Sequence, residues 1–159
     1  MKAKFKLSNP VHFLALGLGS GLLKPAPGTW GTLAAVPLLV LASYFVYFSS
    51  YLFVFICFIG FLLGVYLCGR TAKDVGVHDH SSIVWDEFVG LFVAMIAVQP
   101  SWKTLFLAFV LFRLFDILKP WPISWLDKHV HGGLGIMIDD VLAGLMACAV
   151  LHVLLYLGV

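Results

Sequence analysis

Five acidic side chains occur in three short stretches of an otherwise apolar sequence. They are Asp86, Glu87, Asp116, Asp139 and Asp140. Carboxylates at membrane depth are costly, so they are usually paired, protonated or bound to a cation. Five acids converging from three helix ends would repel one another strongly, and a hard divalent cation such as Mg²⁺ relieves that repulsion with oxygen ligands. We therefore expect all five to be catalytic and metal-binding residues. Simple pairing, for example of Asp116 with Arg113 on the same helix face, is the alternative.

Basic and hydroxyl groups are interleaved with these acids. Arg113 and Lys119 flank Asp116, whereas Lys24 and Thr29 lie in a Gly/Pro-rich stretch at residues 17–31. A site that mixes a metal ion with cationic side chains suits a phosphate-bearing substrate, whose charge must be neutralised. Thr29 is expected to be the N-cap of the helix that follows, and free N–H groups at such an end attract anions. Salt bridges and a tight turn are the alternatives.

Histidines and cysteines suggest weaker hypotheses. Two His-x-His pairs, at residues 78–80 and 129–131, resemble zinc ligands, but loops of this kind lack the rigid spacing of most zinc sites. Substrate contact or solvation is the favoured interpretation. The odd number of cysteines, Cys57, Cys68 and Cys148, argues against a disulfide framework, and we expect them to face the core or lipid.

The composition restricts the class of protein that carries these residues. The 159 residues are 62% apolar and only 11% charged, with a mean hydropathy of +1.03. Soluble domains carry roughly 25% charged residues, so a water-soluble domain is nearly excluded, as is a disordered chain. The net charge of +2 forms no basic stripe, which argues against nucleic-acid binding. The length fits one domain, residues 1–159.

Apolar runs predict an all-α, multihelical integral membrane bundle with about five spans. A helix needs about 20 residues to cross the hydrocarbon core. The predicted spans are residues 29–48, 50–68, 83–98, 104–118 and 141–159. The break at Ser49 and Ser50 makes the first two a hairpin, and a helix over 83–98 would be only ~24 Å long. Residues 10–23 are too short and glycine-rich to span, so we expect an interfacial or re-entrant segment.

Basic residues predict the orientation of this bundle. On one side lie Lys2, Lys4, Lys6, Arg70, Lys73, Lys119 and Lys128, and on the other only Lys103. The positive-inside rule then places the N-terminus in the cytoplasm and the C-terminus outside. Tryptophans at inner span ends agree with this: Trp30, Trp85, Trp121 and Trp125. All eight carboxylates fall on the predicted cytoplasmic side: Asp74, Asp79, Asp86, Glu87, Asp116, Asp127, Asp139 and Asp140.

Four stretches closely resemble the phosphatidylglycerophosphatase A family of bacterial inner-membrane lipid phosphatases. They are GSGLLKPAPGTWGTLAAVP (19–37), GVHDHSSIVWDEFVG (76–90), FRLFDILKPWPISWLD (112–127) and VHGGLGIMIDDVLAG (130–144). The likeness covers most of the chain, with Thr32 where serine is commoner in the family. It implies an all-helical fold and Mg²⁺-dependent removal of the terminal phosphate from phosphatidylglycerophosphate, which gives phosphatidylglycerol. It also implies a multi-pass protein of the inner (cytoplasmic) membrane.

The resemblance carries over a working set of residues, whose individual roles are physical inference. The set is Asp86, Glu87, Arg113, Asp116, Lys119, Asp139 and Asp140. Without an Asp-x-Asp or cysteine-loop nucleophile, direct attack by metal-activated water is the simplest mechanism, with one acid as general base. Arg113 and Lys119 would hold phosphoryl oxygens, with Thr29 as a secondary contact and Lys24 as a further basic group. Asp74, Asp79 and Asp127 are expected to lie in loops or to support the site.

The main alternative is a small membrane transporter or channel that uses its carboxylates for cations. Such a protein would spread its acids across the depth of the bilayer, whereas here they gather on one side. The expected site therefore faces the cytoplasm, where the headgroup of an anionic lipid substrate reaches it from the inner leaflet.

Overall fold

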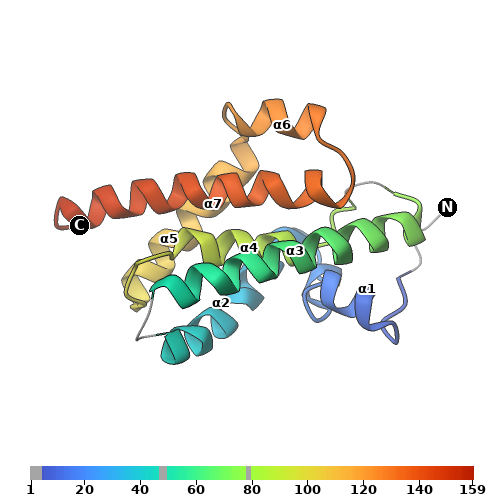
Figure 1. Cartoon of the computed structure of the whole chain (residues 1–159), viewed down its shortest axis with the longest axis horizontal. Coiled ribbons are helices and arrows are strands. Elements are labelled where there is room, and N and C mark those ends of the chain that lie inside the picture. The colour runs from blue at the N-terminus through green and yellow to red at the C-terminus, as the bar shows by residue number, and fades with distance from the viewer. Residues whose placement is uncertain (1–4, 47–49, 78–79) are drawn as a thin grey trace.

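The computed structural model describes residues 5–46, 50–77 and 80–159. Within these ranges the chain forms seven α-helices, one short 3₁₀ helix and no strand, which confirms the predicted all-helical class (Figure 1). The elements are α1 (Pro10–Ala15), η1 (Ser20–Leu22), α2 (Pro27–Val46), α3 (Ser50–Val75), α4 (Trp85–Ala94), α5 (Trp102–Leu118), α6 (Ile123–His129) and α7 (Gly132–Tyr156). Features predicted at Lys2, Lys4, Ser49, His78 and Asp79 lie outside the described residues.

The short helix α4 forms the centre of the bundle. It packs against α2, α3, α5 and α7, and all of its residues except Trp85 and Phe92 are buried. Two contacts fix its position along α3. The Trp85 indole Nε1 donates to the Gly60 carbonyl at 3.0 Å, and the rings of Phe53 and Phe92 stack with centroids 5.9 Å apart. The first turn of α4, which carries two of the predicted acids, is therefore enclosed by the other helices.

Helix α4 is shorter than the predicted helix over residues 83–98. Its ten residues measure about 15 Å, about half the thickness of a hydrocarbon core. The chain leaves the helix after Ala94 and turns through Ala97, which has a φ of 59°. Ser101 then begins α5 with a capping box, in which it accepts from the Thr104 N–H at 3.1 Å. Residues 95–98 thus belong to the turn, and α4 alone does not cross a bilayer.

Among the described residues, α3 and α7 are long and apolar enough to cross a membrane by length and composition. Large apolar side chains are also exposed along α2, α3 and α5, in a surface that we name the apolar belt. It comprises Leu33, Leu38, Leu41, Phe55, Phe58, Leu62, Phe106, Val110 and Leu114. Soluble monomers rarely expose large apolar patches, so the long apolar helices and the number of exposed apolar side chains both suggest a membrane protein. The five spans and their orientation stay predictions.

Helix α7 begins at Gly132, nine residues before the predicted start at residue 141. A side chain at Gly133 would overlap the Val65 carbonyl oxygen and lie 2.9 Å from the Gly69 amide nitrogen of α3. Residues 132–135, three of which are glycines, are helical because they pack backbone to backbone against α3. As a result, Asp139 and Asp140 lie in the third turn of α7 and not before its first turn. Figure 1 shows α7 running along the molecule, with α6 packed on it.

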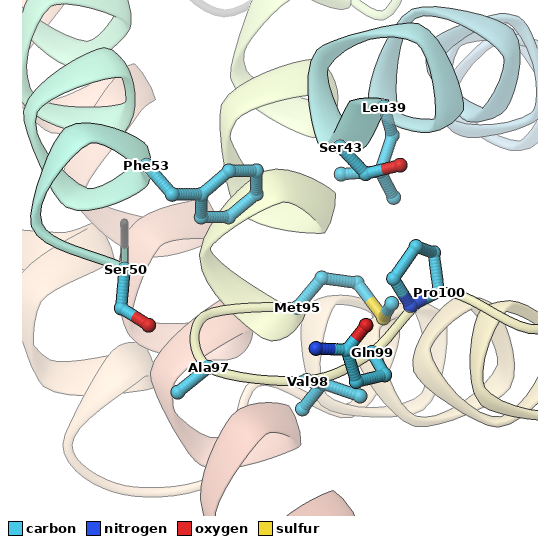
Figure 2. A pocket seen from close by; sticks show the side chains of 9 residues that line it. All are labelled: Leu39, Ser43, Ser50, Phe53, Met95, Ala97, Val98, Gln99 and Pro100. Atoms are coloured by element: carbon cyan, nitrogen blue, oxygen red, sulfur yellow. The ribbon is translucent and has the colours of Figure 1, made fainter. Parts of the chain in front are cut away.

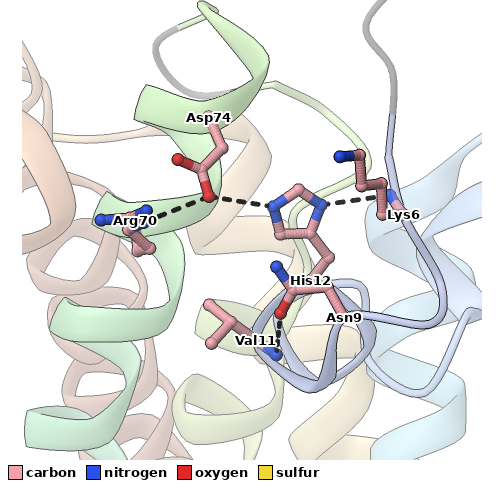
Figure 3. Close-up of polar contacts among 6 residues, drawn as sticks. All are labelled: Lys6, Asn9, Val11, His12, Arg70 and Asp74. Atoms are coloured by element: carbon pink, nitrogen blue, oxygen red, sulfur yellow. Dashed lines mark hydrogen bonds and ion pairs between the residues drawn. The ribbon is translucent and has the colours of Figure 1, made fainter.

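The N-terminal helix α1 docks on the C-terminal part of α3 through a buried histidine (Figure 3). His12 Nε2 lies 3.3 Å from Asp74 Oδ2, and its Nδ1 accepts the backbone N–H of Lys6 at 3.2 Å. Arg70 Nε donates to the same oxygen of Asp74 at 3.2 Å. This contact makes residues 10–15 a packed helix; the predicted interfacial or re-entrant location of the segment stays a prediction.

The cysteines lie where the sequence predicts them. Cys57 and Cys68 are buried and Cys148 is partly buried. The buried pair belongs to the hydrophobic core that α3 shares with α4 and α7.

Candidate active site

Three carboxylates meet between α4 and α7. Asp86 and Glu87 lie in the first turn of α4 and Asp140 lies in the third turn of α7, and all three are buried. One carboxylate oxygen from each of the three residues lies within 4.8 Å of the other two. The two acids of α4 stand at a helix N-terminus, where the macrodipole favours negative charge. We call Asp86, Glu87 and Asp140 the acidic triad.

The acidic triad has the chemistry of a site for a hard cation. Glu87 Oε2 and Asp140 Oδ2 are buried and have no hydrogen-bond partner in the described part of the chain. A buried carboxylate oxygen without a partner is unfavourable, and a bound cation would satisfy it. Because every ligand atom is a carboxylate oxygen, the donor set fits an ion such as Mg²⁺ better than a soft metal. The triad could therefore hold a metal ion.

Helix α5 brings Arg113 and Asp116 to this group. Arg113 Nη1 lies 3.8 Å from Glu87 Oε1 and forms a close ion pair with Asp116 Oδ2. Asp86 and Asp116 are both near enough to Asp140 for their negative charges to disfavour a negative charge on it. The pairing of Asp116 with Arg113, which the sequence offers as the alternative to metal binding, is thus present beside the acidic triad. Arg113 Nε is buried without a partner among the described residues.

The start of α2 closes one side of the site. A side chain at Gly28 would overlap Glu87 Oε1 and lie 3.1 Å from both terminal nitrogens of Arg113, so the α2 backbone passes directly beside them. The predicted N-cap at Thr29 is wrong, because α2 begins at Pro27, a residue well suited to a first helical position. Thr29 lies in the first turn, where it is half-buried, and Lys24 is exposed in the preceding loop. Within the described ranges, neither side chain has an ion pair or hydrogen bond.

Asp139 points to a second charged cluster. Lys119 Nζ donates to Asp139 Oδ2 at 3.0 Å and to Asp127 Oδ1 at 2.7 Å. Partial burial opposes the charge of Lys119, but these two hydrogen bonds raise the pKa of Lys119 above its ordinary value. The hydrogen bond from Lys119 lowers the pKa of Asp127. The predicted residues Asp139 and Lys119 therefore meet each other, while Asp86, Glu87, Asp116, Asp140 and Arg113 form the first cluster.

Asp127 is the residue of this second cluster that the sequence placed only in a supporting role. It follows Lys119 by eight residues across a turn that contains Pro120 and Pro122, a separation that carries no periodic signal of contact. The contact arises because α6 folds back over α7.

The zinc hypothesis finds no support in the described residues. The group of potential metal ligands that they bring together contains carboxylates alone. His80 Nδ1 accepts the Ser82 N–H at 3.1 Å, and His129 Nδ1 lies 2.6 Å from the Trp125 carbonyl oxygen. Both rings are thus engaged locally, in a turn and at the end of α6.

A separate pocket lies at the opposite end of α4 (Figure 2). It is formed by the second half of α2, the start of α3 and the α4–α5 turn, and its polar side chains are Ser43, Ser50 and Gln99. The residues described around it include no acid, base or cation. This pocket therefore offers no charged side chain that could act on a phosphate.

Comparison with known proteins identifies the class of enzyme that carries this site. Residues 13–155 match a family of phosphatases, which are phosphoric monoester hydrolases. The family is phosphatidylglycerophosphatase A, and the chain belongs to it. The predicted enzyme class and the resemblance are thereby confirmed.

Two relatives support this assignment over nearly the full chain. Phosphatidylglycerophosphatase A of Escherichia coli is 48% identical over 152 residues, which cover 95% of this chain and 87% of the relative. Phosphatidylglycerophosphatase A of Haemophilus influenzae is 52% identical over 155 residues, which cover 96% and 93%. A protein of Bacteroides thetaiotaomicron, named as a candidate phosphatidylinositol-3-phosphatase, is 33% identical over 137 residues, which cover 82% and 84%. No solved structure matches the chain significantly.

Proposed function

We propose that this protein hydrolyses the terminal phosphate of phosphatidylglycerophosphate to give phosphatidylglycerol, in a Mg²⁺-dependent reaction at the cytoplasmic face of the bacterial inner membrane. The observation that carries the proposal is the buried acidic triad beside Arg113, with carboxylate oxygens that lack partners in the described chain. The relatives supply the substrate, because two of them with about half of their residues identical are named for it.

Asp86, Glu87 and Asp140 would hold the Mg²⁺, with Asp116 beside them. When bound, the ion would lower the pKa of a water molecule and neutralise charge on the phosphate. The oxygens without partners, Glu87 Oε2 and Asp140 Oδ2, support this assignment. One of these acids would also accept a proton as general base. Asp139, predicted as a further ligand, is proposed instead to hold Lys119 in place.

Two cations of the chain would bind the phosphoryl group. Arg113 presents a planar fork whose Nε is unpartnered among the described atoms, and such a fork matches two phosphate oxygens. Lys119 is partly exposed, with 31% of its side chain accessible, and can approach the phosphate from the polar side. The first turn of α2, with Thr29, offers backbone N–H groups to the same anion. Lys24, which is exposed, would meet the headgroup before it enters.

The position of the site suits a lipid that stays in the membrane. Gly64 of α3 contacts Trp85 of α4 and Met137 of α7, so the triad lies near the level of Gly64. Exposed apolar side chains on α3 continue to Tyr66, and Arg70 and Lys73 follow. The site therefore lies close to the polar boundary of the apolar belt, on the side rich in basic residues. A headgroup can reach it there while the acyl chains remain beside the belt.

Phosphate release from a panel of substrates tests this proposal. Purified protein in detergent is given phosphatidylglycerophosphate, phosphatidylinositol 3-phosphate or glycerol 3-phosphate, each with Mg²⁺ or with EDTA. We expect the highest kcat/KM with phosphatidylglycerophosphate and Mg²⁺, and a loss of activity in EDTA that added Mg²⁺ restores. A clear preference for phosphatidylinositol 3-phosphate would contradict the substrate, and activity that survives exhaustive chelation would contradict the metal.

A further inference from the structure

Helices α4 and α7 touch backbone to backbone at two glycines that neighbour the acidic triad. Gly90 follows Asp86 by four residues, and Gly144 follows Asp140 by four. A Cβ at Gly144 would overlap the carbonyl oxygen of Gly90 and lie 3.0 Å from Val93 Cβ. A Cβ at Gly90 would in turn lie 2.9 Å from the Asp140 carbonyl oxygen. The contact is reciprocal, so the absence of side chains at both positions allows the two helices to approach this closely.

This contact lies on the helix faces that carry the triad. Residues four apart share one face of a helix, one turn of about 5.4 Å away. The glycine contact therefore controls how near Asp86 and Glu87 come to Asp140. Carboxylates held within 4.8 Å of one another repel, so their proximity must be imposed by packing. At Gly144 the nearest opposing atom is a backbone oxygen, so no rotamer change could make room for a methyl group there, whereas at Gly90 the nearest atoms belong to the Phe112 side chain.

A second observation concerns the burial and the unpartnered oxygens of two members of the triad. Glu87 and Asp140 are only 9% and 4% exposed, and each has a carboxylate oxygen without a partner in the described structure. A gap set only by packing would favour neutral or paired groups at these positions. The close approach instead gathers acidic side chains whose unpartnered oxygens a bound cation would satisfy.

We propose that Gly90 and Gly144 are positioning residues that set the spacing of the acidic triad for a small divalent cation. The inference rests on the proposed metal site. Mg²⁺ binds oxygen at about 2.0–2.1 Å with strict octahedral geometry, whereas Ca²⁺ accepts about 2.3–2.6 Å and flexible geometry. A methyl group between the helices widens the site and so shifts its preference from Mg²⁺ toward Ca²⁺.

Calorimetric binding of Mg²⁺ and of Ca²⁺ to the purified full chain tests this. The variants are Gly144→Ala and Gly90→Ala. The matched control is Gly60→Ala, a helical glycine of α3 that faces α4, where the nearest atom to an added Cβ is Val89 Cγ2 at an ordinary 3.4 Å. We expect the Kd for Mg²⁺ to rise about tenfold in Gly144→Ala while the Kd for Ca²⁺ changes less, with neither altered in the control. Gly90→Ala should likewise raise the Kd for Mg²⁺ relative to the Kd for Ca²⁺.

The ratio of the two affinities separates positioning from general damage. An equal loss of both ions, as misfolding would cause, or an unchanged ratio in both variants, overturns the inference. If Gly144→Ala does not fold, Gly90→Ala decides, because part of its crowding falls on the Phe112 side chain, which can move. Absence of Mg²⁺ binding by the unaltered protein would overturn the proposed metal site and this inference with it. Binding that is intact and insensitive to both substitutions would overturn the inference alone.

Discussion

Replacing Asp140 by Asn removes one charge from the acidic triad and keeps the shape of the side chain. The substitution should stabilise the metal-free protein and weaken the stabilisation that a bound metal ion provides. Without metal it relieves repulsion, because Asp140 faces Asp86 and Glu87 within 4.8 Å. With metal it removes a ligand. We therefore expect a variant that is more stable than the unaltered protein in EDTA, gains little from Mg²⁺, and hydrolyses its substrate poorly.

The magnitudes follow from the distances. Two unit charges 4.8 Å apart repel by about 3.5 kcal/mol at an effective dielectric constant of about 20. Arg113, 3.8 Å from Glu87, and protonation of a buried carboxyl each offset part of this repulsion, so we expect a net gain of at most about 2 kcal/mol in EDTA. For a chain of this size that raises the unfolding midpoint by roughly 5 °C. A cation at 100 times its Kd stabilises the unaltered protein by about 2.7 kcal/mol, and the variant should lose most of this.

Thermal unfolding in detergent measures the stability of each protein in EDTA and its stabilisation by Mg²⁺. Phosphate release measures the rate of hydrolysis. Asp127→Asn is the matched control, because it removes an acid from the same end of the bundle but outside the triad. The control should keep the full rise in midpoint on adding Mg²⁺. If Asp140→Asn retains that rise and near-normal turnover, the triad is not the metal site, and a lower midpoint in EDTA would refute the repulsion argument.

Three further predictions concern the cations and the N-terminal contact. Arg113→Lys should lower kcat/KM about 10²-fold, because an ammonium cannot replace the fork beside Glu87; a change within about twofold in the release assay would contradict this. His12→Phe should lower the free energy of unfolding by about 2 kcal/mol and speed proteolysis near α1, yet leave kcat unchanged, whereas a loss of turnover would assign α1 a role in the site. Because Lys119 lowers the pKa of Asp127, their pair stabilises the fold above the unfolded pKa of about 3.9, and that stability is lost as pH falls through the lower folded value. Asp127→Asn should flatten this acid limb of the unfolding midpoint, and an identical limb in the variant would contradict it.

Hydropathy and charge predict much of this molecule. The predicted start of the second long helix at Ser50 agrees with α3. Acids of α4 and α7 meet as the charge pattern predicts, and Arg113 links Asp116 of α5 to them. These features depend on composition and on the cost of burying charge, both of which are local properties of the sequence.

Features that depend on contacts between helices escape the sequence. The stretch from His131 to Gly135 has the composition of a turn, since glycine disfavours a helix by about 1 kcal/mol per residue. It is mostly helical because Gly133 fits against the α3 backbone. Asp139 and Asp140 are adjacent in the sequence, yet neighbouring helical residues point about 100° apart, so one meets Lys119 and the other the triad. The rotation of α7 about its axis determines that Asp139 meets Lys119 and that Asp140 joins the triad.

The central claim is that the acidic triad holds the Mg²⁺ on which hydrolysis depends. Its most direct test is phosphate release from phosphatidylglycerophosphate by the purified protein and by Asp140→Asn, titrated with Mg²⁺ after chelation. We predict that the unaltered protein is inactive in EDTA and regains activity as Mg²⁺ rises, while the variant stays inactive at every concentration. Metal-independent release by the unaltered protein, or an unchanged Mg²⁺ titration in the variant, would contradict the claim.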